Sequence, residues 1–459
     1  MFFEEAAVYP RITKSHTPVT VHGKLFDIPR ALQQYPDTEL KLFYIPDSGL
    51  DCDGKIVYYR DFLEQPCCFR EDGTFSFEFR PQQEGEYTFK LTVHKNGENF
   101  KDLGTFSCYA LDSDLYDLVP RKGDTHVHTL HSACGKFDEE PSYAAATARE
   151  RGLDFVFITD HIQRDPSIFA RDALKEFSSD FSVYPGEECH AIKSKDEKTF
   201  YKAILYMSLH QLSLGASYGV SDYTNEHFEE YQQFIEARKL TLDQNISEDQ
   251  RTLMAAIDWI VDKTHEFGGI SIFAHPFWRP STRLNLAPEV RQYILNNGKF
   301  DAIEVFGLGS PGHSNASFVE GNCQCANWLM EESIRLGRRL PVTGSTDSHN
   351  ARALLGYQYT LLFAEDDTLE AAKEAIKSGK TVAVSNMPGQ NPFMYGSPRL
   401  VQYACFLLRE YFPEHDEACA AEGKLMLRAL RGECSAELVK SYSEGLTAGL
   451  WKRFSGKNQ

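Results

Sequence analysis

Five short segments of the chain carry His, Asp and Glu side chains at the ends of expected strands. They read Asp124-Thr125-His126-Val127-His128-Thr129, Thr159-Asp160-His161, Gly186-Glu187-Glu188, Ala274-His275-Pro276 and Gly344-Ser345-Thr346-Asp347-Ser348-His349. In a strand, His126 and His128 project from the same face because they are two residues apart, so both can bind one cation. Mixed imidazole and carboxylate ligands suit manganese, iron and zinc. The spacing therefore indicates a centre for divalent cations.

A His or a carboxylate at a single strand end is ordinarily a hydrogen-bonded core residue or a helix cap. Five such groups at five similar positions would then need five separate explanations, whereas one metal centre explains all of them. Active sites of α/β folds lie at the carboxyl ends of strands, where these groups stand. The sequence therefore predicts a metal-dependent enzyme.

The elements that must position these groups begin at Gly123, where apolar stretches start to alternate with helical segments. The strand candidates are residues 155–158, 203–206, 270–273, 302–305 and 340–342. Gly152, Gly268 and Gly337 end the helices before the next strands. The Glu-, Gln- and Asp-rich segment 215–250 interrupts the alternation and is interpreted as an excursion or a lid. The pattern predicts an α/β domain.

The regions before and after this domain have different patterns. Residues 1–120 contain short alternating stretches separated by Gly, Pro, Asp and Asn, which predict an antiparallel β-sandwich. The α/β domain that carries the metal ligands is expected over residues 121–390. Residues 391–459 have helical spacing and predict a C-terminal helical extension. The sequence thus predicts three domains.

The charge balance favours a small ligand. Asp and Glu number 66 and Lys and Arg 48, which gives a net charge of −18 over 459 residues. This average field repels nucleic-acid backbones and anionic lipid surfaces, so neither long duplex nucleic acid nor a membrane is an expected partner. Bound cations can still make one pocket positive, so a small anionic substrate is expected. The oligomeric state stays open.

Cysteine usage and the N-terminus bear on the compartment. Eleven cysteines without regular spacing indicate reduced thiols rather than a disulfide framework. The first residues, Met1-Phe2-Phe3-Glu4-Glu5, do not form a secretory signal, and no apolar run approaches the roughly 20 residues of a membrane span. A cytoplasmic protein is expected.

The order of the five motifs resembles the PHP superfamily, named for polymerase and histidinol phosphatase. The family pattern runs Asp-x-His-x-His-Thr, Thr-Asp-His, Gly-x-Glu, His-Pro and Gly-Ser-Asp-x-His, and the similarity extends here from Asp124 to His349. The resemblance implies a distorted (β/α)7 TIM-like barrel with two or three divalent ions (manganese, iron or zinc) at its C-terminal mouth. An N-terminal β domain ahead of the barrel looks like stand-alone members and the carbamate-hydrolase-like branch rather than a polymerase subunit.

The resemblance also distributes the ligands over three ions. It implies that the first ion is held by His126, His128, Glu188 and Asp347. Glu188 would bridge to the second ion, which His275 would also bind, and His161 and His349 would belong to the third ion.

Two carboxylates beside these ligands have other expected roles. Asp160 is expected to orient its neighbour or a helix terminus and to take part in proton transfer. Glu187 is either a further ligand or a local hydrogen-bond acceptor.

The chain departs from the family pattern first after Thr129. The family usually has Ser-Asp-Gly or a His there, whereas this chain reads Ser132-Ala133-Cys134-Gly135. Cys134 is the plausible replacement ligand, because a thiolate binds zinc well. A buried inert thiol is equally common, and His131 is an alternative donor on the opposite strand face.

A second departure follows Glu188. The family has another His on the next strand, but Phe200-Tyr201-Lys202-Ala203 occupies that region. The second metal position could therefore be weakened, or Lys202 could bind a substrate phosphate. His190 either reaches the site or faces solvent.

The expected activity is a phosphoesterase (EC 3.1) that acts on a small phosphate ester through a hydroxide held between the cations. Arg279 and Arg352 are candidates for a phosphate clamp, since guanidinium groups bind phosphate through paired hydrogen bonds. A surface salt bridge is the simpler reading of either arginine. The same metals could instead hydrolyse a carbamate, ester or amide, and a catalytically eroded protein with a binding or regulatory role is the third possibility.

Overall fold

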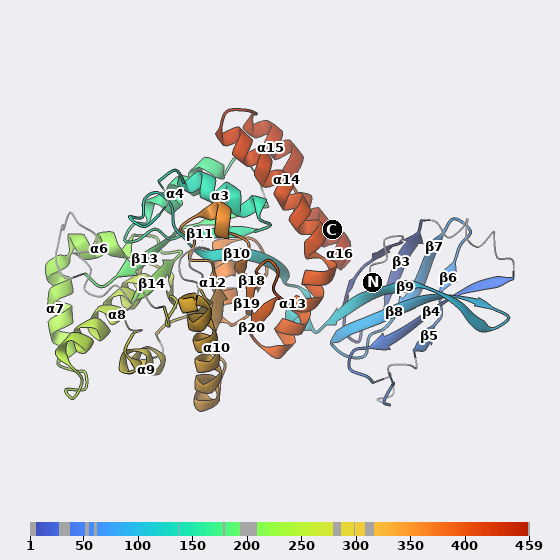
Figure 1. Ribbon diagram of the computed structural model, residues 1–459, viewed down its shortest axis with the longest axis horizontal. Helices are drawn as coiled ribbons and strands as arrows, with labels where there is room; N and C mark the ends of the chain where they lie inside the picture. Colours follow the sequence, from blue (N-terminus) through green and yellow to red (C-terminus); the bar gives the residue numbers. More distant parts are fainter. Residues whose placement is uncertain are drawn as a thin grey trace. The chain divides into compact units, whose positions relative to one another are not determined.

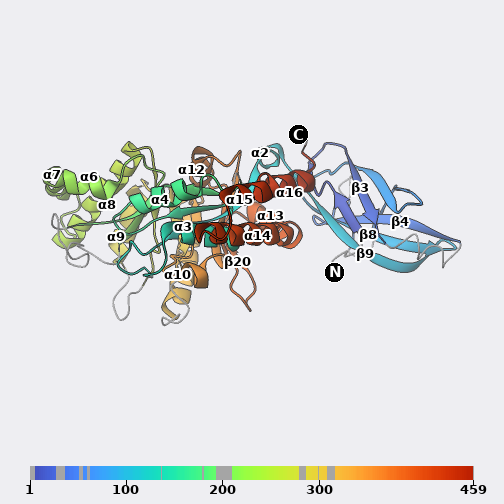
Figure 2. The same ribbon diagram turned by 90° about the horizontal axis from the view of Figure 1, so that it is seen from above.

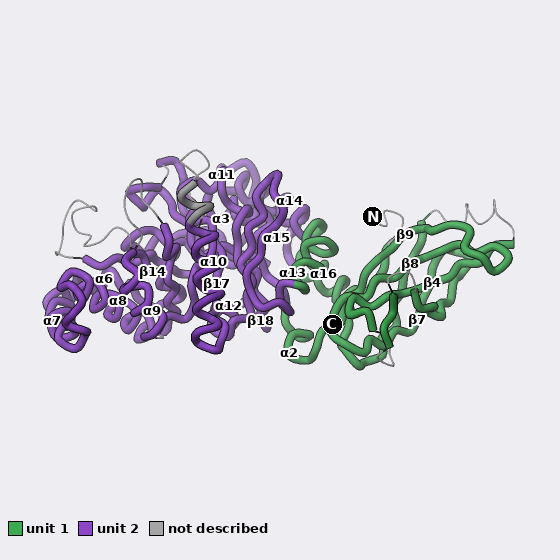
Figure 3. The backbone as a smooth tube through the Cα atoms, turned by 60° about the horizontal axis from the view of Figure 1, so that its bottom comes forward, with its two compact units in different colours: residues 1–118, 402–414, 447–459 green, residues 119–401, 415–446 purple. Residues whose placement is uncertain are grey.

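The computed structural model describes most of the chain (Figure 1). Described are residues 6–26, 37–50, 55–58, 62–135, 137–177, 180–192, 209–278, 286–297, 299–307 and 316–457, without the side chains of 316–320. The chain forms two compact units, coloured in Figure 3. The first contains residues 1–118, 402–414 and 447–459, and the second contains residues 119–401 and 415–446. The three-domain division stays a prediction.

The first unit is built on two β-sheets that share one core. One sheet has the order β1-β3-β7-β6, with β1 (Ala6–Tyr9), β3 (Val19–Leu25), β7 (Thr74–Phe79) and β6 (Cys68–Phe69). The other has the order β2-β9-β8-β4-β5, with β2 (Ile12–Lys14), β9 (Glu98–Leu111), β8 (Gly85–Lys95), β4 (Thr38–Pro46) and β5 (Leu63–Gln65). The β2–β9 pairing is parallel, which departs from the antiparallel expectation.

Alternation along the strands fills this core. Phe75, Phe77 and Phe79 of β7 are buried because alternate side chains of a strand face one side. Phe77 packs on Phe89 of the opposite sheet at 5.0 Å between ring centroids, and Phe89 stacks on Phe106 at 5.1 Å. Burial of each ring contributes about 1.5–3 kcal/mol, so the aromatic rings are a principal stabilising element of this unit.

The second unit is a mixed α/β structure with two sheets. The first sheet has the order β12-β11-β10-β18-β19-β20, formed by β12 (Ser182–Tyr184), β11 (Phe155–Ile158), β10 (Val119–Val127), β18 (Gln358–Ala364), β19 (Thr381–Ser385) and β20 (Phe393–Tyr395). The second has the order β13-β14-β15-β16-β17, formed by β13 (Gly186–His190), β14 (His210–Leu214), β15 (Ile270–Phe273), β16 (Ala302–Phe306) and β17 (Val342–Gly344). Isolated parallel bridges join Val127 to Ser348 and His161 to Glu188.

The expected strands agree well with these elements. Residues 155–158 form β11, residues 270–273 form β15, and residues 302–305 lie in β16. The candidate at 340–342 overlaps β17 only at Val342, the first residue of that strand. The candidate at 203–206 lies outside the described residues. The interruption at 215–250 contains α6 (Val220–Glu226), α7 (Phe228–Lys239) and the start of α8 (Glu248–Glu266), which lie together in Figures 1 and 2.

Helix α8 shows how local sequence sets the ends of an element. The Ser247 hydroxyl accepts a hydrogen bond from the Gln250 backbone N–H, which caps the first turn. Gly268 follows the helix with φ 74°, a left-handed conformation that glycine adopts at little cost. Leu253, Ile257 and Ile260 recur at helical spacing and are buried. Among the described residues, no helix combines the length and apolar character needed to cross a bilayer.

A buried charge network joins α14 (Phe412–Leu430) to α3 (Pro141–Glu150) and to Asp154, the residue before β11. The Arg149 side chain is fully buried and donates to Glu422 Oε2 at 2.9 Å and to Asp154 Oδ1 at 3.0 Å. His415 Nε2 lies 2.8 Å from the same Asp154 oxygen. Each charge therefore has a partner in a region that excludes water.

Replacing Arg149 by Met is expected to lower the free energy of unfolding by about 3–5 kcal/mol, because the fully buried Glu422 would lose its cationic partner. Urea unfolding followed by circular dichroism measures the loss. The exposed Arg431 provides the control, since Arg431→Met should change stability by less than about 0.5 kcal/mol. Equal effects of the two substitutions would contradict the role given to the buried network.

Candidate metal centre

The structure brings the predicted ligands to one place. They come from β10 and the residue after it (His126, His128), the end of β11 (His161), β13 (Glu188), the end of β15 (His275) and the segment after β17 (Asp347, His349). His126, His128 and Glu188 are fully buried, and the His349 side chain is 27% exposed. Groups up to 223 residues apart in the sequence thus meet at one centre.

Strand direction explains why one further histidine joins them. Strand β14 runs antiparallel to both β13 and β15, so its first residue lies where its neighbours end. That first residue is His210, paired with His190. The sequence led us to look for a histidine near residues 200–203, and the structure places His210 beside the other candidate ligands instead.

Glu188 is surrounded by imidazole nitrogens. Its Oε2 lies 2.6 Å from His161 Nδ1, and its Oε1 lies 2.5 Å from His210 Nδ1. Ring nitrogens of His126, His128 and His275 lie 3.3–3.4 Å from the carboxylate. Burial alone would raise the pKa of Glu188, but the field of the imidazoles outweighs it and holds the pKa well below its ordinary value. Glu188 is therefore an ionised, central ligand candidate.

Several ring nitrogens of these histidines also face one another. His126 Nε2 lies 3.1 Å from His128 Nε2, and His210 Nδ1 lies 3.2 Å from His275 Nε2. His190 Nε2 lies 2.8 Å from His161 Nδ1. Such nitrogen pairs cannot both be donors, whereas two lone pairs directed at a shared point suit a cation between them.

The described residues contain four possible ligand groups at this centre, each with donor atoms within 4.8 Å of one another. They are His126/His128/Glu188, His126/His275/Asp347, His161/Glu188/His190/His210 and His128/Cys134/His161/His349. The His and carboxylate donor set fits manganese, iron or zinc. The residues therefore fit the divalent ions that the motifs predict.

Glu304 of β16 supports the centre and was not anticipated. Its Oε1 lies 3.1 Å from His126 Nδ1 and accepts a hydrogen bond from the Ser345 hydroxyl, while Oε2 accepts from the His275 backbone N–H at 2.8 Å. A carboxylate acceptor places the imidazole proton on Nδ1, so Nε2 of His126 is directed at Glu188. A lone acidic residue within the apolar stretch Ala302-Ile303-Glu304-Val305-Phe306 was the available signal.

Replacing Glu304 by Gln is expected to weaken metal binding by about 10–100-fold, because the amide has no charge and only one acceptor oxygen for His126 Nδ1 and the His275 N–H, which now use both carboxylate oxygens. Competition with a chromogenic chelator measures the affinity. The exposed Glu331 offers a matched control, and Glu331→Gln should leave the affinity unchanged. If Glu304→Gln bound metal as tightly as the wild type, Glu304 would not be a positioning residue.

Asp160 acts through a neighbour rather than on the centre directly. Its carboxylate accepts from the Thr129 backbone N–H at 2.8 Å, the Thr129 hydroxyl at 2.6 Å and the Ser132 hydroxyl at 2.5 Å. Ser132 Oγ in turn lies 3.0 Å from His128 Nδ1. The geometry therefore gives Asp160 an orienting position, one of the two roles expected for it.

The other residues named in the sequence analysis lie away from the candidate ligands or outside the described residues. The Glu187 carboxylate accepts from the backbone N–H groups of Val220 and Ser221 at the start of α6. Arg352 is exposed on α11 (Ala351–Leu354). His131 belongs to none of the ligand groups found among the described residues. Lys202 and Arg279 lie outside the described residues.

Two ligand candidates adopt unusual backbone conformations. His275 has φ 22° and Asp347 has φ 49°, both in the positive range that non-glycine residues rarely adopt. Each such conformation costs about 1–3 kcal/mol and persists where the surroundings hold it in place. At His275, the hydrogen bond from its N–H to Glu304 provides that restraint.

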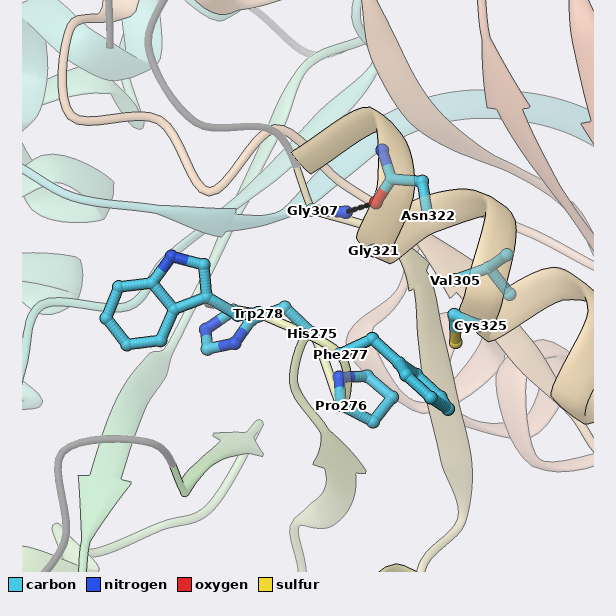
Figure 4. A pocket seen from close by; sticks show the side chains of 9 residues that line it. All are labelled: His275, Pro276, Phe277, Trp278, Val305, Gly307, Gly321, Asn322 and Cys325. Atoms are coloured by element: carbon cyan, nitrogen blue, oxygen red, sulfur yellow. Dashed lines mark hydrogen bonds between the residues drawn. The ribbon is translucent and has the colours of Figure 1, made fainter. Parts of the chain in front are cut away.

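A small, partly open pocket adjoins the centre at His275 (Figure 4). It is lined by His275, Pro276, Phe277, Trp278, Val305, Gly307, Gly321, Asn322 and Cys325. The Trp278 ring lies 5.4 Å from the His275 and His210 rings. No Asp, Glu, Lys or Arg is among these described lining residues, so the pocket suits a neutral group.

Comparison with known proteins adds a structural resemblance. No family model matches the chain, and no curated protein matches it. A two-domain protein of Bacteroides vulgatus containing a predicted PHP-like metal-dependent phosphoesterase is similar, with 16% identity over 59% of this chain and a TM-score of 0.38. A PHP-like protein, the family that the motifs resemble, is thus among the solved structures similar to this chain. The PHP-like match spans 66% of the Bacteroides chain, just under two thirds of its length.

Two further solved structures are similar to this chain. An amidohydrolase of Chromobacterium violaceum has 17% identity over 51% of this chain and 89% of its own, with a TM-score of 0.30. Endonuclease Q in complex with a 27-mer duplex has 15% identity over 57% of each chain, with a TM-score of 0.34. At these TM-scores the similarities carry no argument about activity.

One expectation from the charge balance is wrong. Long duplex nucleic acid was excluded because of the net charge of −18, but Endonuclease Q, a similar protein, was solved with a duplex substrate. Net charge describes the average field of a whole protein, whereas bound cations and nearby side chains set the field at one site. The exclusion of duplex nucleic acid is therefore withdrawn.

Proposed function

We propose that the chain is a metal-dependent phosphoesterase whose centre is organised by Glu188. The observation that carries this proposal is that the two oxygens of its carboxylate face different imidazoles: Oε2 lies 3.3–3.4 Å from His126 and His128, and Oε1 lies 2.5 Å from His210 and 3.4 Å from His275. A carboxylate with a separate imidazole at each oxygen can bridge two cations. When bound, a pair of divalent cations about 3.5–4 Å apart activates water and neutralises charge on the oxygens of an in-line displacement.

The other ligands divide around Glu188. His126, His128 and Asp347 would hold the first ion, and Asp347 Oδ1 lies 3.0 Å from His128 Nε2. His210, His190 and His275 would supply nitrogen donors for the second, and His161 would belong with His349 to the outer group. Glu304 would hold His126 in the required tautomer, and Asp160 would orient His128 through Ser132. Lys202, Arg279 and Arg352 remain proposed phosphate-binding residues.

Strand connectivity supports a distorted seven-stranded barrel around this centre. Strands β10 and β11 pair, the bridge from His161 to Glu188 leads from the end of β11 to β13, and the second sheet continues to β17. The bridge from Ser348 to Val127 leads back to β10. A ring of β10, β11, β13, β14, β15, β16 and β17 would place the ligands at one mouth.

The aromatic rim of the pocket beside His275 would contact the organic part of the ester. Its described lining is uncharged and includes the Trp278 and Phe277 rings, so it would favour an aryl group over a second phosphate. We expect Trp278→Ala to raise KM for an aryl phosphate about tenfold, equivalent to about 1.4 kcal/mol, because the ring contact is lost.

Steady-state kinetics with phenyl phosphate and methyl phosphate measure this effect. Trp278→Phe, which keeps a flat ring, should retain most of the preference for the phenyl ester. A uniform loss on both esters in Trp278→Ala would show that the ring does not contact the organic group.

The function itself is tested by comparing ester classes. The manganese-, iron- or zinc-loaded protein is given nitrophenyl phosphate, bis-nitrophenyl phosphate, a nitrophenyl carbamate and nitrophenyl acetate, and a duplex oligonucleotide. Hydrolysis of phosphate esters that disappears after chelation supports the proposal. Turnover of only the carbamate or acetate would replace it with carbonyl hydrolysis. A metal-loaded protein inert on every ester would indicate a binding role.

A further inference from the structure

The ligand group nearest to solvent differs from the others in composition. Cys134 is exposed and the His349 side chain is 27% exposed, whereas Glu188, His126 and His128 are fully buried. Of the four groups at the centre in the described part of the chain, this one alone contains sulfur. His128 Nε2 lies 3.0 Å from Asp347 Oδ1 and is assigned with Asp347 to the first position, which leaves Cys134, His161 and His349 as the donors of this group.

Hydrogen bonding leaves His349 with a free nitrogen lone pair on the side that faces the Cys134 thiol. Its Nδ1 lies 2.8 Å from the backbone carbonyl oxygen of Asp347, an atom that can only accept. The proton therefore resides on Nδ1, and Nε2 carries a lone pair. This Nε2 lies 3.1 Å from Cys134 Sγ. A nitrogen lone pair and a thiol sulfur thus face one another at the solvent side of the centre.

The turn that carries Cys134 is built for this position. Gly135 donates its N–H to the Ser132 carbonyl at 2.9 Å, and a Cβ at position 135 would lie 1.8 Å from the Thr129 carbonyl oxygen. Only glycine fits there without moving the backbone. Ser132 in the same turn is held by Asp160. These contacts fix the turn and so hold the Cys134 thiol next to His349.

We propose that Cys134, His161 and His349 form an outer zinc position that is chemically distinct from the inner, all-nitrogen-and-oxygen positions. The inference deepens the proposed function, on which it rests, by naming the metal and the ligand at one position of the centre. In a tetrahedral zinc site with Zn–S near 2.3 Å and Zn–N near 2.0–2.1 Å, sulfur and nitrogen are roughly 3.6 Å apart. The observed 3.1 Å requires only a small outward shift.

The composition of the group determines its metal preference. A thiolate is a soft ligand that favours zinc, whereas carboxylate-rich groups also accept manganese and iron. Zinc binding displaces the thiol proton to solvent, so the bond forms between the thiolate and the ion. With three protein ligands and an exposed side, the position keeps one coordination site open toward substrate or water.

Cobalt substitution tests the thiolate bond without reference to activity. The protein is stripped with a chelator under reducing conditions and reloaded with Co²⁺. We expect a sulfur-to-cobalt charge-transfer band in the near ultraviolet for the wild type and for Cys323→Ser, whose thiol is also exposed. Cys134→Ser should lose the band and, after zinc loading, hold about one zinc ion fewer per chain by mass spectrometry.

Absence of the band in the wild type, or its persistence in Cys134→Ser, would overturn the outer zinc position. The result is separable from the proposed function. A cysteine-dependent band in a protein that hydrolyses no phosphate ester would support the zinc position and reject the phosphoesterase. Phosphate ester hydrolysis with no cysteine-dependent band would do the reverse.

Discussion

Replacing Glu188 by Gln is expected to reduce kcat/KM for a phosphate ester by at least about 1,000-fold, equivalent to about 4 kcal/mol of transition-state stabilisation. The amide loses the negative charge and offers one oxygen, whereas the carboxylate has Oε1 beside His210 and Oε2 beside His161. Both inner metal positions would lose their shared ligand. Metal content by mass spectrometry should fall together with activity.

The neighbouring Glu187 provides a matched control. It lies on the same strand, but its oxygens accept hydrogen bonds from Val220 and Ser221 rather than facing the imidazoles. Burial raises the pKa of Glu187 to about 7, so a neutral side chain with an acceptor oxygen is a close substitute. Glu187→Gln should therefore retain metal and activity. Equal losses in the two variants would reject the bridging role of Glu188.

Replacing His210 by Ala is expected to lower metal affinity and kcat/KM by about 100-fold. His210 Nδ1 lies 2.5 Å from Glu188 Oε1 and 3.2 Å from His275 Nε2, so its removal takes away a nitrogen donor from the second position. The first position, with His126, His128 and Asp347, keeps its ligands. Titration of the metal-free protein should then resolve one weakened site and one unchanged site.

A control for His210 is available on the surface. His227 is exposed at the end of α6 and stacks on Tyr223, away from the described ligand groups. His227→Ala should leave both metal affinities unchanged. If His210→Ala also left them unchanged, the antiparallel strand would not contribute a ligand, and the second position would be incomplete as the family pattern in the sequence suggests.

The N-terminal β domain and the helix ends were largely predictable because their causes are local. Alternation of Phe75, Phe77 and Phe79 needs only neighbouring residues to indicate a strand with one buried face. The capping residue Ser247 and the left-handed Gly268 act within one turn of α8. Parallel pairing of β2 with β9 was not predictable, since it joins residues almost 100 positions apart.

The candidate ligands His126, His128, His161, Glu188, His275, Asp347 and His349 were readable from residue type and strand-end position. His210 was not, because a histidine at the start of a strand reaches the same mouth only if that strand runs antiparallel to its neighbours. Strand direction is a property of the sheet, and a stretch such as Leu209-His210-Gln211-Leu212 reads the same in either direction.

The sequence alone therefore determined which chemical groups stand at which strand ends, because residue type and period are local quantities. Only the tertiary structure decided which atoms face each other: Glu304 beside His126 Nδ1, 178 residues away, and Cys134 beside His349 Nε2, 215 residues away. Such pairs depend on how strands and turns are packed, and hydrogen bonds and metal bonds change steeply over a few tenths of an ångström.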